Sequence, residues 1–209
     1  MEYSKLKSGT DIRGVAVEGV PGEPVNLTDE VIETIAAAFL VWVERHLQKK
    51  PAGLKVALGH DSRISADRIS DALKRVFCKY GVQTLDCGLA STPSMFWATL
   101  GLPCDCSVQI TASHHPYHRN GLKFFTPAGG LDAPDITEIL ELAQQGACPA
   151  QEAPGVVLPC GYMKAYAQRL RRTIQEGVGA ADYEHPLKGF HIVVDAGNGA
   201  GGFYATDVL

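Results

Sequence analysis

The sequence alternates between amphipathic helical segments and short apolar segments that are typical of buried strands. The first helical pattern follows Thr28, whose side chain can cap it, and keeps apolar residues at helical spacing until Pro51. Residues 54–58 form an apolar, strand-like run, and a second helical pattern over 65–80 ends before Gly81. This order favours a mostly parallel or mixed sheet with helices on both faces. We therefore expect an α/β fold.

The alternation continues through the middle of the chain. Thr92 and Pro93 are typical of a helix start, and the helix that they begin should end near Gly101. Further strands are predicted over 82–87, 106–111 and 122–125, and a further helix over 134–145. With the preceding elements, these predict one complete α/β domain over 1–145.

A second domain is predicted after a linker over 146–160, where Ala, Pro, Gly and Gln replace any helical or strand period. Residues 162–175 have a helical pattern, residues 190–195 resemble a strand, and a glycine-rich turn follows over 197–202. One helix and one strand cannot close a core. We therefore expect residues 161–209 to be the truncated start of a second α/β domain.

Composition excludes several classes of protein. Of the 209 residues, 45% are hydrophobic and 20% are charged, which is typical of a globular chain. The formal net charge of −4 gives no basic field to attract nucleic acid or an anionic membrane. The longest charge-free apolar run, residues 35–43, is too short to cross a bilayer. Six cysteines without a Cys-x-x-Cys pair favour reduced thiols, with disulfides as the alternative.

The chain shows no export signal or transit peptide, so we expect a cytoplasmic protein. An organelle such as the chloroplast stays open, because the sequence can start within a longer chain.

The densest polar cluster, residues 111–123, follows an apolar strand, and ligands of open α/β sheets bind at such strand ends. Ser113 is the natural nucleophile or phosphate carrier, since Pro116 and the Asn120-Gly121 pair fold the loop back and expose its hydroxyl. Cations that could converge on it are Arg13, Arg63, Arg119 and Lys123. In the alternative interpretation, Ser113 only caps a turn and the polar residues are solvated surface.

Four motifs occur in an order that resembles the amino-terminal part of the α-D-phosphohexomutases. This family includes phosphoglucomutase, phosphomannomutase and phosphoglucosamine mutase. The motifs span residues 8–14, 59–63, 111–116 with 120–123, and 193–202. The chain departs from the family pattern with His60 where Arg is common, His115 where Asn is usual and Arg119 where Tyr is common.

The resemblance implies an intramolecular phosphotransferase that moves phosphate between O1 and O6 of a phosphosugar. Ser113 would be the phosphoserine, and a bisphosphorylated sugar the intermediate. Arg13 and Lys123 would neutralise the phosphoryl group and assist proton transfer, and His114 would position the serine hydroxyl. Residues that would bind substrate or phosphate are Thr10, Arg63 and Asn120.

The resemblance also implies a cofactor and a limit on the chain's activity. Mg²⁺ would be held by the phosphate on Ser113 together with Asp side chains that lie outside this chain, and hexose 1,6-bisphosphate would be the activator. The partner would be a small phosphosugar, and no oligomeric state is indicated. We therefore expect the isolated chain to have little or no mutase activity.

Other functions remain open at this point. The run over 197–202 matches the G-x-G-x-x-G pattern of dinucleotide sites. Histidines at 114, 115 and 118 with cysteines at 104 and 106 could suggest zinc, although their spacing matches no common zinc pattern. A serine hydrolase is disfavoured because Ser113 lacks a G-x-S-x-G elbow. A diverged, non-catalytic mutase domain that binds a phosphosugar or a protein is the main alternative.

Overall fold

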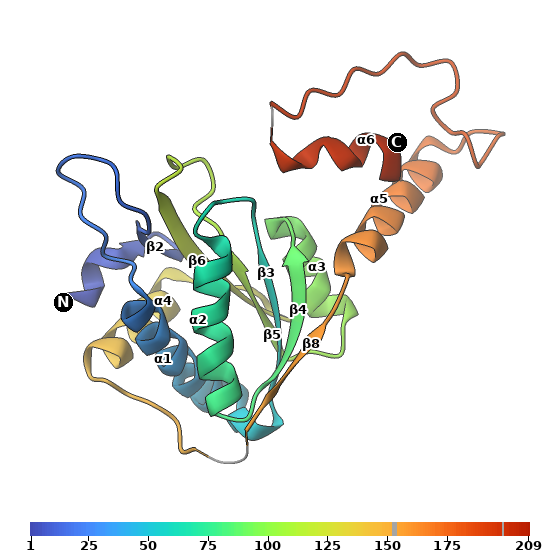
Figure 1. Cartoon of the computed structure of the whole chain (residues 1–209). Helices are drawn as coiled ribbons and strands as arrows, with labels where there is room; N and C mark the ends of the chain where they lie inside the picture. The colour runs from blue at the N-terminus through green and yellow to red at the C-terminus, as the bar shows by residue number, and fades with distance from the viewer. Residues whose placement is uncertain (152–153, 198) are drawn as a thin grey trace. The chain divides into compact units, whose positions relative to one another are not determined.

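The computed structural model describes residues 1–151, 154–197 and 199–209. Residues 152 and 153 of the expected linker and Asn198 of the glycine-rich turn lie outside the described residues. The chain divides into two compact units, Met1–Cys160 and Gly161–Leu209. Figure 1 shows the elements of both units, coloured along the chain.

The first unit is built on a mixed sheet with the strand order β1-β2-β6-β5-β3-β4-β8, and β7 pairs with β6. Strands β3, β4, β5 and β8 are parallel to one another, whereas β1, β2, β6 and β7 pair antiparallel with their neighbours. This confirms the predicted mixed α/β sheet. The strands are β1 (Lys7–Ser8), β2 (Asp11–Val15), β3 (Lys55–His60), β4 (Gln83–Leu89), β5 (Cys106–Ile110), β6 (Arg119–Thr126), β7 (Gly129–Gly130) and β8 (Val156–Pro159).

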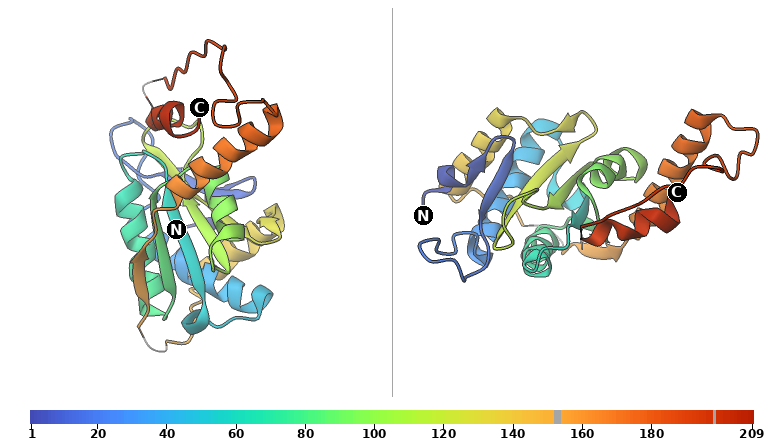
Figure 2. Two further views of the ribbon diagram at one scale, coloured as in Figure 1. Left: turned by 90° about the vertical axis from the view of Figure 1, so that its right-hand side faces the viewer. Right: turned by 90° about the horizontal axis from the view of Figure 1, so that it is seen from above.

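Helices cover both faces of this sheet, as predicted. Figure 2 shows them from two further directions. Residues of α1, α2 and α4 join the main core on one face, whereas α3 packs on the other, where Phe96 contacts Phe125 of β6. The helices are α1 (Asp29–Leu47), α2 (Ala66–Lys79), α3 (Thr92–Gly101) and α4 (Ala133–Gln144), with 3-10 turns η1 (Tyr3–Leu6) and η2 (Pro51–Gly53).

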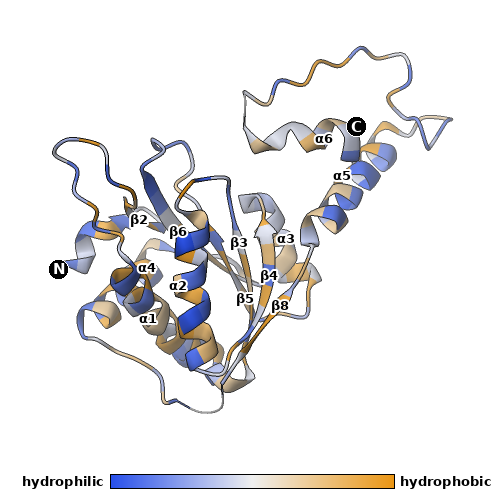
Figure 3. Cartoon of the chain, viewed as in Figure 1, coloured by the Kyte–Doolittle hydropathy of each residue, from blue (hydrophilic) through white to orange (hydrophobic). Residues whose placement is uncertain are grey.

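Local sequence explains where these helices begin. The Thr28 side chain accepts a hydrogen bond from the backbone N–H of Val31, which caps α1 as predicted. Ser91 and Ser94 form a capping box at the start of α3. The hydropathy colouring of Figure 3 shows hydrophilic residues along the outward side of α2, which leaves its apolar side for the sheet.

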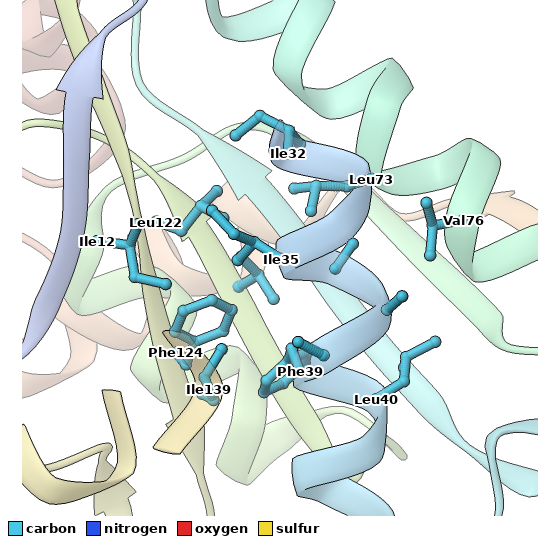
Figure 4. Close-up of a cluster of buried hydrophobic side chains, with 14 of the residues drawn as sticks. Ile12, Ile32, Ile35, Phe39, Leu40, Leu73, Val76, Leu122, Phe124 and Ile139 are labelled. Atoms are coloured by element: carbon cyan, nitrogen blue, oxygen red, sulfur yellow. The ribbon is translucent and has the colours of Figure 1, made fainter. Parts of the chain in front are cut away.

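The main core lies between the sheet and helices α1, α2 and α4. Phe39 of α1 stacks on Phe124 of β6 with ring centroids 4.5 Å apart, and Ile12, Ile35 and Ile139 lie around them (Figure 4). All five side chains are almost completely buried. Because β2, β5 and β6 are held to the helices by this core, the polar side chains at their ends have a rigid support.

Two parts of the first unit differ from the sequence predictions. The β1–β2 hairpin was not predicted, because β1 has only two residues and the segment is rich in polar side chains. The expected linker over 146–160 contains β8, which pairs in parallel with β4. Val156 and Leu158 are exposed there, so β8 lacks the buried pattern that would have identified it.

The second unit contains α5 (Tyr162–Val178), η3 (Ala200–Phe203) and α6 (Tyr204–Asp207). Helix α5 agrees with the predicted helix, and Gly179 ends it in the left-handed conformation. The strand predicted over 190–195 is wrong: these residues form no strand and are exposed. Their apolar side chains have no neighbouring strand in the described part of the chain.

No helix among the described residues is long and apolar enough to cross a membrane.

Candidate active site

The loop between β5 and β6 carries Ser113 at the carboxyl end of a central strand. Ser113 is exposed and adopts φ 57°, a left-handed conformation that costs a non-glycine residue roughly 1–3 kcal/mol. Its N–H donates to Thr111 Oγ1 at 3.0 Å, and its Oγ lies 3.3 Å from Nδ1 of His114. The hydroxyl is therefore presented to solvent with an imidazole beside it.

Arg63 holds this loop from within. Its Nη1 donates to the carbonyl oxygens of Pro116 and Arg119, at 2.8 and 2.9 Å. Its Nη2 donates to those of Ser113 and His115, at 2.9 and 2.6 Å. We expected Arg63 to bind substrate or phosphate, but in this structure its guanidinium is directed at the loop backbone, where it fixes the conformation of Ser113.

Asp61 completes the support of the loop. Its Oδ2 accepts a hydrogen bond from Thr111 Oγ1 at 2.7 Å and lies 3.3 Å from Nε of Arg63. Because Thr111 Oγ1 also accepts the N–H of Ser113, a chain of contacts connects the end of β3 to the backbone of Ser113.

Arg13 on β2 and Lys123 on β6, the two predicted catalytic cations, lie on one face of the sheet and share a partner. Both contact Asp11, with Nη2 of Arg13 at 2.6 Å and Nζ of Lys123 at 2.5 Å from its carboxylate oxygens. Asp11 is 3% exposed and was missed by the sequence analysis. The signal that could have found it is the i, i+2 spacing from Arg13, which puts both side chains on one face of a strand.

Positive charge gathers around the loop. Partial burial lowers the pKa of His115, and the charges of Arg13, His114 and Arg119 lower it further. Arg119 itself is paired with Glu23, whose carboxylate also lies 3.2 Å from Nε2 of the buried His118. Cationic side chains therefore lie near His115, and Arg119 among them is already paired with a carboxylate.

Two other predicted binding residues do not lie with Ser113. Asn120 is completely buried; its amide nitrogen donates to Ser65 Oγ at 2.9 Å, and its side-chain oxygen accepts the N–H of Gly121. Thr10 is exposed in the β1–β2 turn, at the end of β2 opposite to Val15, which pairs with Arg119 beside the loop. Asn120 thus supports the start of β6 from inside the fold.

Gly121 allows the strands below the loop to approach closely. A Cβ at this position would lie 2.2 Å from the carbonyl oxygen of Ile12 and 2.9 Å from Cγ of Arg13. The absence of a side chain therefore lets β2 and β6 pair in the register that brings Arg13 to the loop.

The structure disfavours the transition-metal alternative. Cys106 begins β5 and His114 follows its other end, so the strand, which is about 15 Å long, separates the two groups. His118 is buried against Glu23. In the described residues, no group of three or more His, Cys, Asp or Glu side chains is placed to hold a metal ion.

These features define an open α/β domain with a basic site at the carboxyl ends of its central strands. The family model "Phosphoglucomutase/phosphomannomutase, alpha/beta/alpha domain I" matches residues 5–147, so the chain belongs to the phosphoglucomutase/phosphomannomutase family. This confirms the family to which the four motifs pointed.

Two sequence relatives illustrate the match. A phosphoglucosamine mutase from Moorella thermoacetica is 34% identical over 194 residues, which cover 92% of this chain and 40% of that protein. A phosphoglucosamine mutase from Desulforudis audaxviator is 32% identical over 208 residues, covering 96% and 42%. The chain thus spans about two fifths of the length of these relatives.

Two solved structures share the fold. A phosphoglucomutase/phosphomannomutase family protein from Burkholderia thailandensis superposes with a TM-score of 0.66 at 22% identity, covering 81% of this chain and 36% of that one. A structure described as a phosphomannomutase from Thermus thermophilus gives 0.62 at 23% identity, covering 83% and 37%.

Proposed function

We propose that this chain is the phosphoserine-carrying part of a hexose phosphate mutase. The observation that carries the proposal is the exposed hydroxyl of Ser113, held in a left-handed conformation after β5, beside the imidazole of His114 and on a loop whose backbone is bound by Arg63. A phosphoserine adds about −1.5 to −2 charges, and a basic environment stabilises it.

In the proposed reaction, the bond from phosphorus to Ser113 Oγ breaks and phosphorus bonds to a free hydroxyl oxygen of the hexose phosphate. The proton of that hydroxyl ends on Ser113 Oγ, which restores the serine hydroxyl. The bisphosphorylated sugar then returns its other phosphoryl group to Ser113. Arg13 and Lys123 neutralise the phosphoryl oxygens, and His114 hydrogen-bonds the serine oxygen. Arg63 keeps the loop in the reactive conformation through its four backbone contacts.

The proposal also concerns the identity of the hexose phosphate and the role of a metal ion. The names of the two phosphoglucosamine mutase relatives favour an amino sugar phosphate as substrate. Mg²⁺ supplies charge neutralisation in phosphoryl transfer when it is bound. The side chains described around Ser113 are mainly basic and do not fit a divalent cation by themselves.

Mutase assays test the proposal. The 209-residue chain alone should turn over no hexose 1-phosphate, whereas a fusion to the remaining part of the Moorella thermoacetica relative should be active. Ser113→Ala should abolish activity in the fusion, and Ser4→Ala, at an exposed serine in η1, should leave it unchanged.

An active Ser113→Ala fusion would contradict the assignment of the phosphoserine. A folded fusion that binds a hexose phosphate but never transfers phosphate would favour the alternative of a non-catalytic binding module.

A further inference from the structure

The carboxylate of Asp11 divides its two oxygens between the two predicted catalytic cations. Oδ2 accepts hydrogen bonds from Nε and Nη2 of Arg13, and Oδ1 accepts one from Nζ of Lys123. Among the described residues, Nη1 of Arg13 makes no hydrogen bond, so a donor of this guanidinium remains for another acceptor.

Strand geometry explains why these three side chains meet. Side chains alternate along β2, so Asp11 and Arg13 lie on one face, while Ile12 between them enters the main core on the other. Arg13 pairs with Gly121 and Ile12 with Leu122, and the same register places Asp11 opposite Lys123. The contact is therefore built from the backbone pairing of β2 with β6.

The three charged side chains of this arrangement are largely buried. The side chain of Asp11 is 4% exposed, that of Arg13 14% and that of Lys123 23%. Two cations on neighbouring strands repel each other in such a poorly solvated site unless an anion lies between them. Charge-assisted hydrogen bonds to the two oxygens of a single carboxylate fix the direction of both side chains.

We propose that Asp11 is a positioning residue of the basic site, which keeps Arg13 and Lys123 side by side before an anionic ligand arrives. The inference rests on the proposed function, because that function makes these two cations the groups that neutralise the phosphoryl group. Both oxygens of Asp11 already accept hydrogen bonds from the cations, so it acts through them and not on the substrate.

The test is the exchange of side-chain hydrogens with water in the 209-residue chain, measured by NMR. In the unchanged protein, the Nε–H of Arg13 should exchange at least tenfold more slowly than that of the exposed Arg172. Asp11→Asn keeps only one acceptor oxygen and no charge for the two cations, so it should speed the exchange of the Arg13 Nε–H, of the Lys123 ammonium group, or of both. The Arg13→Lys variant identifies the Arg13 signal by its loss.

A matched control is available on α1. Asp29 also lies between two cations, Arg68 and Arg75 of α2. Asp29→Asn should change the Arg68 and Arg75 signals and leave the Arg13 signal as it was. A general loss of stability would alter both sets of signals in both variants.

A folded Asp11→Asn protein with unchanged Arg13 and Lys123 signals would overturn the proposal. If this variant does not fold, the exchange rate of the Arg13 Nε–H in the unchanged protein is the test. Slow exchange supports the proposal, and exchange as fast as that of Arg172 overturns it. Absence of phosphate from Ser113 in an active mutase would count against the proposed function alone, since the exchange measurement needs no catalysis.

Discussion

Two apolar segments, residues 106–110 and 190–195, precede the two most distinctive loops of the chain, yet they have opposite structures. The first is β5, which lies between β3 and β6 and is buried at every residue. The second forms no strand in the described part of the chain and is exposed throughout. Val108 is 0% exposed, whereas Val193 is 82% exposed.

The difference shows that a strand depends on its neighbours as much as on its own residues. β-branched residues are enriched in both segments, but this preference mainly reflects packing on a half-buried sheet. β5 has partners on both sides and helices over both faces. The loop after β5 therefore has a rigid support for Ser113, and the glycine-rich run after residue 195 has no such support among the described residues.

The largest predicted difference is in backbone hydrogen exchange. Amide hydrogens of β5 should exchange at least a thousandfold more slowly than those of residues 190–194, because exchange from a central strand requires unfolding of the core. Hydrogen exchange followed by mass spectrometry of peptides measures both regions in one sample. Equal exchange in the two segments would contradict the comparison.

The next largest difference is expected when a large side chain is shortened to alanine in each region and the free energy of unfolding is compared. Phe124→Ala should lower the free energy of unfolding of the first unit by about 3–5 kcal/mol, because Phe124 is 2% exposed and stacks on Phe39. Val193→Ala should change it by less than about 0.5 kcal/mol. Urea unfolding gives both values, and a cost near zero for Phe124→Ala would mean that the core is not packed as described.

A smaller effect is expected from a single methyl group near the loop. Gly121→Ala should destabilise the first unit by about 1–3 kcal/mol, because its Cβ would meet the carbonyl oxygen of Ile12 and force β2 away from β6. Gly201→Ala serves as the control, since its Cβ would have only an ordinary contact with Tyr204. Thermal unfolding compares the two variants, and equal effects would show that the approach of β2 to β6 tolerates a side chain.

The smallest predicted effect concerns the charge of the loop. Burial and nearby cations lower the pKa of His115, so the folded protein binds fewer protons there than the unfolded chain. This contribution to stability is present above the ordinary histidine value and is lost as the pH falls toward the lowered pKa. Arg13→Gln should raise the pKa of His115 slightly, which an NMR titration measures; a further decrease would contradict the described cation cluster.

Much of the first unit could be predicted because local signals agree with tertiary packing. Thr28 caps α1, Pro93 lies in the first turn of α3, and apolar periodicity identifies the buried strands β3 and β5. The prediction of a strand over 190–195 was wrong because the residues of that segment do not indicate whether another strand is available to pair with it. Strand β8 was not predicted for the opposite reason. It pairs with β4, but most of its side chains are exposed, so it lacks the pattern of a buried strand.

The site was predictable in its residue types but not in the direction of each side chain. Ser113 was predicted because it follows a buried strand, whereas the roles of His114, Arg13 and Lys123 were predicted from the resemblance to the family motifs. The inward direction of Arg63 depends on the shape of a loop fifty residues away in sequence. The contacts of Asp11 depend on cross-strand register, which a single sequence does not specify.

The most direct measurement of the central claim is fragmentation mass spectrometry of the protein purified from its native source. The account predicts one phosphoryl group, on the peptide that contains residues 111–123, with fragment ions that assign it to Ser113. Stable phosphate on any other residue of an active mutase, with Ser113 unmodified, would contradict the account.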